Sequence, residues 1–136
     1  MRPALFLLAV GTTLACASGP SFEAFREDLR QRAGSAAQDC GMVARGAPHA
    51  GAFSCANAAL ASQRPFFVSF HVMGTDSQIH LGLVLTTEGV AQQATWDSDV
   101  WGGSKLFPER RVSWRACPRP ALSFLNDDVE LACNSE

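Results

Sequence analysis

Three side chains in the middle of the chain, His71, His80 and Asp97, could together bind a metal ion or move a proton. If a four-residue turn at 74–77 closes the first of two hairpins, His71 lies directly opposite His80. If the second hairpin turns on residues 88–89 alone, His80 also lies opposite Asp97. Two imidazoles and a carboxylate in one row can hold zinc or copper, or support general acid–base catalysis. The alternative interpretation is three polar side chains on the solvent-facing side of a half-buried sheet.

A second acidic pattern starts at the same aspartate and resembles the beginning of an EF-hand calcium loop. Asp97, Asp99 and Gly102 match the first, third and sixth positions of such a loop. Trp101 stands at the fifth position and Pro108 at the twelfth, where calcium loops place oxygen ligands. We therefore expect an acidic turn at a strand end rather than a calcium site.

Nucleophilic side chains show no catalytic arrangement in the sequence. Ser69, Ser77 and Ser98 are expected near the two histidines, but the Gly-x-Ser-x-Gly elbow of α/β-hydrolases is missing. The cysteines are expected to be used elsewhere, and no cofactor-binding motif is found. We expect a protein that is not an enzyme and needs no cofactor.

Two aromatic side chains are candidates for contacting a partner. Trp101 stands beside two glycines in an expected loop, and Phe67 is expected on the outer face of the sheet. Exposed aromatic residues often anchor protein partners. Packing beneath the C-terminal tail is the alternative for either of them.

The five cysteines are Cys16, Cys40, Cys55, Cys117 and Cys133. The last four predict two disulfides in an exported chain, with Cys40–Cys55 and Cys117–Cys133 favoured because each pair brackets a short segment. A zinc site is the alternative, but no Cys-x-x-Cys pair is present. The N-terminal cysteine is then the odd one and needs a separate explanation.

Residues 1–15 have the features of a secretory signal peptide. Arg2 supplies the positive start, and the apolar run from Ala4 to Val10 is too short to span a bilayer. Thr13-Leu14-Ala15-Cys16 then resembles the lipobox of bacterial lipoprotein precursors. This resemblance implies cleavage before Cys16, acylation of that cysteine and anchoring to a membrane.

Two processing routes stay open for this precursor. In the lipoprotein route, Ala17 after the acylated Cys16 points to the outer membrane, because aspartate at that position is the usual signal for the inner one. In the other route, signal peptidase cleaves after Ala17 and releases a soluble periplasmic or secreted protein. Both routes leave residues 21–136 as one domain, and in the lipoprotein route residues 16–20 form its tether.

The charge balance excludes one class of partner. The chain has a formal net charge of −2 and no basic stripe. A nucleic-acid-binding protein needs clustered lysine and arginine to neutralise phosphates. We therefore expect no nucleic-acid partner.

The hydrophobic pattern predicts the elements that position these residues. A helix is expected from Ser21, as N-cap, to Ala33, and a second from Cys55 to Ser62 after a loop at 35–53. Alternating segments predict four antiparallel strands, and two apolar clusters follow in the tail. The predicted strands span residues 66–73, 78–86, 90–97 and 111–117.

These elements predict an α+β domain in which the N-terminal helix packs on a four-stranded antiparallel meander. The even residues from Phe66 to Val72 and the odd residues from Ile79 to Leu85 are expected on one face. Ala94 and Trp96 are expected to extend that face, which the first helix would cover.

A short segment also resembles a family of protease inhibitors. Residues 78–82 read Gln-Ile-His-Leu-Gly, similar to the Gln-x-Val-x-Gly hairpin of cystatins. The resemblance implies inhibition of cysteine proteases. The favoured function is nevertheless a lipid-anchored envelope protein that binds an unknown envelope protein or component. A periplasmic metal-binding module using His71, His80 and Asp97 is the other alternative.

Overall fold

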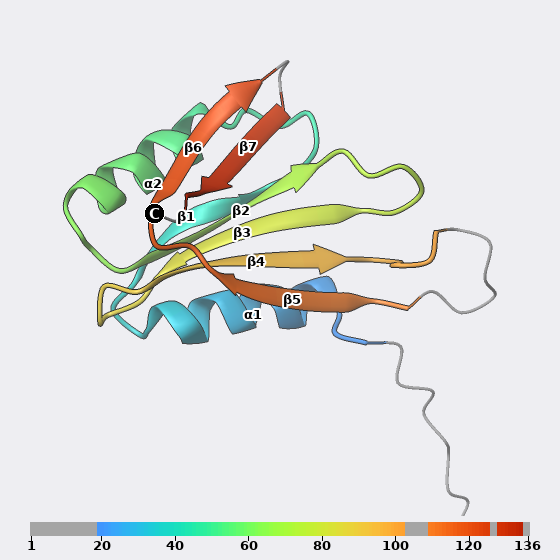
Figure 1. Cartoon of the computed structure of the whole chain (residues 1–136), viewed down its shortest axis with the longest axis horizontal. Coiled ribbons are helices and arrows are strands. Elements are labelled where there is room, and N and C mark those ends of the chain that lie inside the picture. The colour runs from blue at the N-terminus through green and yellow to red at the C-terminus, as the bar shows by residue number, and fades with distance from the viewer. Residues whose placement is uncertain (1–18, 103–108, 126–127, 135–136) are drawn as a thin grey trace, which may run out of the picture.

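The computed structural model describes residues 19–102, 109–125 and 128–134, which form a layered α+β domain (Figure 1). In chain order the elements are α1 (Phe22–Ala33), β1 (Gln38–Val43), α2 (Ala50–Ala61), β2 (Phe66–Val72), β3 (Ile79–Leu85), β4 (Ala91–Asp97), β5 (Arg111–Ala116), β6 (Pro120–Leu125) and β7 (Asp128–Cys133). None of the helices in these residues is long and apolar enough to cross a bilayer. The predicted signal peptide and Cys16 lie outside the described residues.

The main sheet has the order β1-β2-β3-β4-β5. Its last four strands form the predicted antiparallel meander, with strand ends close to those expected. The first strand was not predicted: β1 lies in the segment expected to be a loop and pairs with β2 in parallel. The helix α2 connects these two parallel strands, as such a crossover requires.

Helix α1 forms as predicted. The Ser21 hydroxyl accepts a hydrogen bond from the Ala24 amide at the N-cap, and Gly34 ends the helix with φ 98°. Phe25 and Leu29 are fully buried against the sheet. The alanine-rich helix α2 begins at Ala50, earlier than predicted, and has no side-chain cap. Alanine's helix propensity accounts for that early start.

The second hairpin corrects the predicted register. Its turn has three residues, 87–89, between Thr86 and Val90, and Gly89 adopts φ 75°. A three-residue turn that ends in a left-handed glycine is a common hairpin form. Leu85 therefore pairs with Ala91, and every residue of β4 moves by one position relative to the prediction.

The shifted register decides which face α1 covers. Ala94 and Trp96 lie on the same face as Phe67, and α1 packs on that face through Phe25 and Leu29. The prediction that α1 covers the opposite face, with Ala94 and Trp96 as part of it, is wrong. The single-residue change in the turn is the physical reason.

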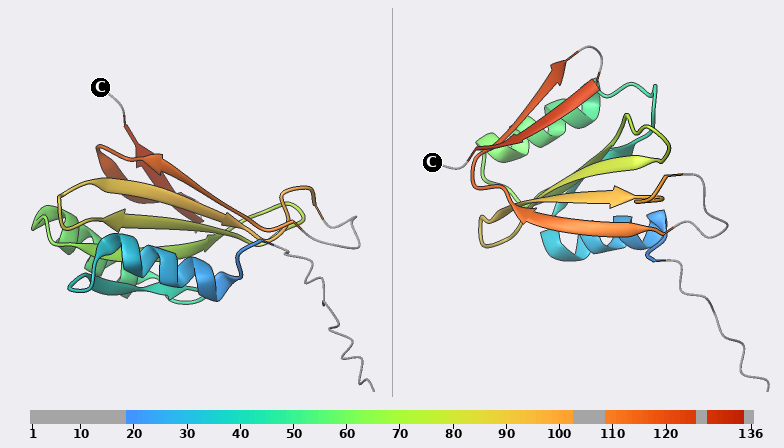
Figure 2. Two further views of the ribbon diagram at one scale, coloured as in Figure 1. Left: turned by 90° about the horizontal axis from the view of Figure 1, so that it is seen from below. Right: turned by 45° about the vertical axis from the view of Figure 1, so that its right-hand side comes forward.

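The opposite face is also covered. Phe66, Val68 and Phe70 of β2 pack under α2 and the β6–β7 hairpin, which contributes Leu131. The sheet therefore lies between α1 on one side and α2 with β6–β7 on the other (Figure 2). Both faces of β2 are buried, so it is not the half-exposed strand that was expected.

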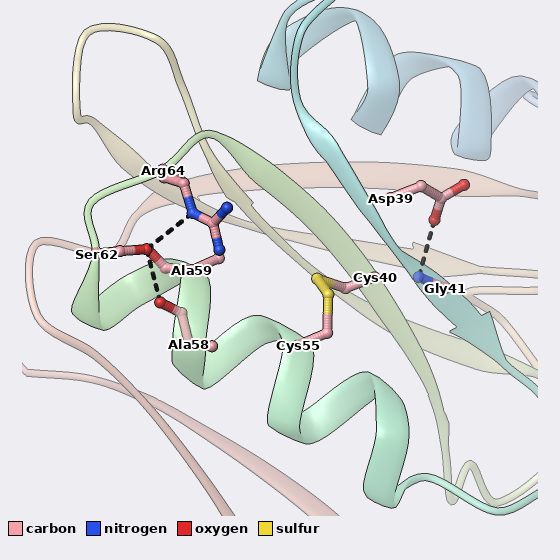
Figure 3. The surroundings of a disulfide bond; sticks show 8 residues. All are labelled: Asp39, Cys40, Gly41, Cys55, Ala58, Ala59, Ser62 and Arg64. Atoms are coloured by element: carbon pink, nitrogen blue, oxygen red, sulfur yellow. Dashed lines mark hydrogen bonds between the residues drawn. A yellow bond between two sulfur atoms is a disulfide. The ribbon is translucent and has the colours of Figure 1, made fainter.

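Two disulfides join the elements in the predicted pairs. Cys40 of β1 is bonded to Cys55 of α2, at the irregularity of β1 where the Gly41 amide donates to the Asp39 carboxylate (Figure 3). Cys117, which follows β5, is bonded to Cys133 at the end of β7. The first bond ties the crossover helix to the edge strand, and the second holds the β6–β7 hairpin against the sheet.

Candidate binding site at the histidine pair

The two central histidines lie side by side on neighbouring strands. His71 of β2 pairs with His80 of β3, as predicted, and their ring centroids are 4.9 Å apart with an angle of 27° between the planes. Asp97 does not join them: it pairs with Ile79, and Trp96 takes the position opposite His80. The predicted row of His71, His80 and Asp97 is therefore wrong at its third member.

This geometry does not form a metal centre. Asp97 belongs to the opposite face of the sheet because successive side chains alternate sides. Within residues 19–102, 109–125 and 128–134, no three histidine, cysteine or acidic side chains are grouped so that they could hold a metal ion. The two rings stack on each other, an arrangement typical of packing.

His80 is buried within an aromatic cluster. Its side chain is 8% exposed, and its ring centroid lies 4.3 Å from that of Phe22 and 5.9 Å from that of Trp96. Burial, together with the repulsion from the neighbouring His71, lowers the pKa of His80 to about 4. The ring is therefore neutral at pH 7.

The Ser69 hydroxyl is hydrogen-bonded to Nδ1 of His80 at 3.3 Å. In the tautomer in which the hydroxyl donates, Nε2–H is the remaining donor of the ring. Ser69 is fully buried, so no substrate can reach its oxygen. The pair positions the imidazole and does not supply an accessible nucleophile.

His71 is partly exposed and lies between charges of opposite sign. Burial lowers its pKa, the Arg45 guanidinium lowers it further, and the Asp128 carboxylate acts in the opposite direction. Arg45 Nη2 also donates to the sulfur of Met73 at 3.3 Å. Arg45 is therefore a positive charge held close to a neutral histidine.

A hollow of about 410 Å³ opens beside the histidine pair. Its apolar lining comes from Phe22 of α1, Met42 of β1 and Ala44. Its polar lining consists of side chains that can donate hydrogen bonds. These four are Arg45, His71, Gln78 and His80.

A second hollow, of about 360 Å³, is lined by the segment that follows β1, residues 44–49. His71 and Ala44 line both hollows, and Asp128 of β7 contributes an acidic group to the second one. The residues that follow β1 therefore lie close to His71. Sequence reasoning missed Arg45 and Met42 because it treated residues 35–53 as a loop. The Cys40–Cys55 pairing, which ties this segment to α2, was the only signal of its position.

The structure places the other predicted site residues away from the histidine pair or in other roles. Phe67 is 2% exposed and packs under α1, so its predicted role as an exposed partner contact is wrong. Trp101 is 59% exposed, and its indole nitrogen donates to the Glu109 carboxylate. Of the calcium-like pattern, Asp97 accepts from the amide of Asp99, which accepts from that of Trp101. Pro108 lies outside the described residues.

The cystatin-like segment is not at an exposed hairpin tip. Ile79 to Gly82 form the first half of β3, at the centre of the sheet. Gly82 is buried where Leu29 and Phe25 of α1 approach the strand closely. Inhibitory hairpins must enter a protease, and this segment is already covered by a helix.

No protein-family model and no curated protein matches this sequence, and no solved structure matches the fold.

The buried His80 predicts that the domain loses stability in mild acid. Folding lowers its pKa from 6.5 to about 4, so the unfolded chain binds the proton more tightly. The free energy of unfolding should fall as the pH drops from 6.5 towards 4. We expect this residue to contribute about 2–3 kcal/mol to that loss.

Denaturant unfolding of the wild type and of His80→Gln across this pH range tests the prediction. The variant should show a clearly shallower decline, since it lacks the titrating group. Equal slopes for the two proteins would show that the buried imidazole is not the cause.

Proposed function

We propose that the chain is an exported envelope protein, anchored through acylated Cys16, whose domain binds an envelope ligand at the His71–His80 hollow. The ligand class is a small molecule or partner group with an apolar part and an anionic or strongly hydrogen-bond-accepting part. The observation that carries the binding proposal is the hollow's lining, with apolar Phe22 and Met42 beside the cationic Arg45.

The chemistry of the lining supports this ligand class. Ligand sites are typically concave and mostly apolar, with a few convergent polar groups that set orientation. Neutral histidines and Gln78 can each donate to an acceptor, and Arg45 adds the positive charge that favours an anion. Since the described lining holds no carboxylate, no charge there repels an anionic group.

The two disulfides support the export part of the proposal. Disulfides persist in oxidising compartments such as the periplasm and are rare in the cytosol. The lipobox-like Thr13-Leu14-Ala15-Cys16 supports the anchor and accounts for the fifth cysteine. Ser69, whose hydroxyl is bonded to His80, is fully buried, which is compatible with a non-enzymatic role.

An NMR titration with hexanoate, using hexanol as the uncharged match, tests the binding site. The chain from Ser18 onward, exported so that both disulfides form, should show hexanoate-dependent shifts at Arg45, His71, Gln78 and His80. Arg45→Gln should weaken hexanoate binding about tenfold, because a charge-assisted hydrogen bond is lost.

The matched control is Arg64→Gln. Arg64 is also exposed, but it follows α2 at the opposite end of β2, where it bonds to Ser62. It should leave the affinity unchanged. Equal binding of hexanol and hexanoate, or insensitivity to Arg45→Gln, would contradict the proposed site.

A further inference from the structure

We infer that the domain stands with one end on the lipid bilayer, and that Met73 and Trp101 are the side chains that contact the headgroup layer. This inference rests on the proposed acylation of Cys16. It adds an orientation and a contact surface to the anchor.

The end of the domain that we place on the bilayer, called the contact end below, is formed by loops that pack together. The β2–β3 turn, the end of β4 and the start of β5 lie at the end of the sheet where α1 begins (Figure 1). Gln78 and Ser98 join the turn to the loop after β4 by two backbone-amide hydrogen bonds, of 2.8 and 3.0 Å. The Val100 amide donates to the Glu109 carbonyl at 3.0 Å, which links this loop to the residues before β5.

The chain enters the domain at this same end. The Pro20 carbonyl accepts a 3.0 Å hydrogen bond from the Trp96 indole, and Gly19 packs against the Arg110 backbone so closely that a Cβ would collide. Gly19 is therefore held by the domain. The point where the tether stops and the fold begins is fixed beside the loops of the contact end.

The length of the tether limits how far this end can be from the membrane. Only two residues separate Cys16 from Gly19 in the sequence. Consecutive Cα atoms are about 3.8 Å apart, so the three virtual bonds span at most roughly 11 Å. With its lipid in the bilayer, Cys16 must keep Gly19 and the loops around it at the depth of the headgroups or just above.

The contact end carries unusual apolar exposure. Met73 is 68% exposed and Trp101 is 59% exposed, and both are on its loops. Val90, which is 49% exposed, is the only other exposed large hydrophobic side chain among the described residues, and it directly follows the β3–β4 turn at the far end. Tryptophan favours the membrane–water interface because its ring is apolar and its N–H is polar.

The charges of the contact end are not arranged to attract anionic lipid, so such attraction is not what holds this end on the membrane. Arg45 and Arg110 are near the same loops as Asp76 and Asp99, so basic and acidic groups are mixed there. Polybasic clusters are needed for strong attraction to anionic headgroups. The anchor and the two apolar side chains therefore hold this end on the surface. Phe22 and Gln78 also line the hollow, so the hollow is close to the contact end.

Tryptophan quenching in vesicles tests the orientation. The full mature protein, carrying its acyl groups, is reconstituted into phosphatidylethanolamine–phosphatidylglycerol vesicles that contain a lipid spin-labelled near the headgroup. We expect strong quenching in the wild type and clearly weaker quenching in Trp101→Phe, where the buried Trp96, whose indole bonds to Pro20 at the same end, and Trp114 remain. The matched control is Trp114→Phe, which should keep most of the quenching, because Trp114 is in mid-strand on β5 and stacks on Arg32 of α1.

Intact-mass analysis of the same preparation separates the possible failures. If the protein is acylated and Trp101→Phe is quenched as strongly as the wild type, the orientation is wrong and the anchor stands. If the protein made in its native cells carries no acyl group, the anchor and the orientation are both wrong. Neither result bears on the hexanoate site, which is tested separately.

Discussion

Replacing Cys117 and Cys133 together with alanine should lower the free energy of unfolding by about 3–5 kcal/mol. The bond closes a loop with a sequence separation of 16 residues, and chain entropy alone accounts for about 3 kcal/mol of that loss. The remainder comes from the hairpin β6–β7, because an isolated two-stranded hairpin is marginal in water. Cys117 is also fully buried in the core that Leu131 covers.

The matched control is the Cys40→Ala/Cys55→Ala pair, which opens a loop of nearly the same length, with a separation of 15 residues. It should cost less, about 2–3 kcal/mol, because β1 stays paired with β2 without the bond. Denaturant unfolding measures both losses, and amide exchange should show the β6–β7 hairpin opening first in the Cys117/Cys133 variant. A loss under about 1 kcal/mol there would mean that packing alone holds the hairpin.

Gly82→Val should destabilise the domain by about 3 kcal/mol, because α1 leaves no room for a side chain on the middle of β3. A Cβ at Gly82 would lie 2.8 Å from Cδ2 of Leu29, 3.2 Å from Cζ of Phe25 and 3.3 Å from Cβ of Ala94. All three neighbours are fully buried, so none can move aside without disturbing the core.

Two further variants separate crowding from other effects of valine. Gly51→Val places the same side chain on an exposed position of α2 with open space around it, and should change stability by less than about 0.5 kcal/mol. Leu29→Ala combined with Gly82→Val should cost at least about 1 kcal/mol less than the sum of the two single variants. Strict additivity would show that the close approach of Leu29 to β3 is not the source of the loss.

The strands of the meander could be predicted because their hydrophobic alternation is regular and their turns carry glycine or polar residues. The register of the first hairpin was correct, which brought His71 opposite His80. The second was wrong by one residue, since a turn on 88–89 and one on 87–89 are equally compatible with Glu88-Gly89. Because of this one-residue difference, Trp96 and not Asp97 lies opposite His80.

The edge strand β1 could not be predicted because its sequence carries no clear alternation. Cys40 is the only buried residue of this strand, and its glycine, Gly41, adopts φ 105°. Pairing with β2 and the bond to Cys55 hold the segment in place, and both are long-range contacts. Arg45 and Met42 therefore reach the hollow through tertiary structure that local patterns do not encode.

The prediction for Phe67 was wrong for a different reason. The residues from Phe66 to Phe70 are all buried, although hydrophobic alternation alone predicted that one face of β2 is exposed to solvent. Four of these five residues are apolar, and a near-continuous apolar run is typical of a strand that is covered on both sides. That signal was present in the sequence and would have placed Phe67 in the core.

Intact-mass analysis of the protein isolated from its native cells tests export and lipid anchoring most directly. Free thiols are alkylated under denaturing, non-reducing conditions before the measurement. The account predicts a chain without residues 1–15, with acyl groups on Cys16 and no alkylated cysteine among the other four. A chain that still begins at Met1 and carries alkylated Cys40, Cys55, Cys117 and Cys133 would contradict it.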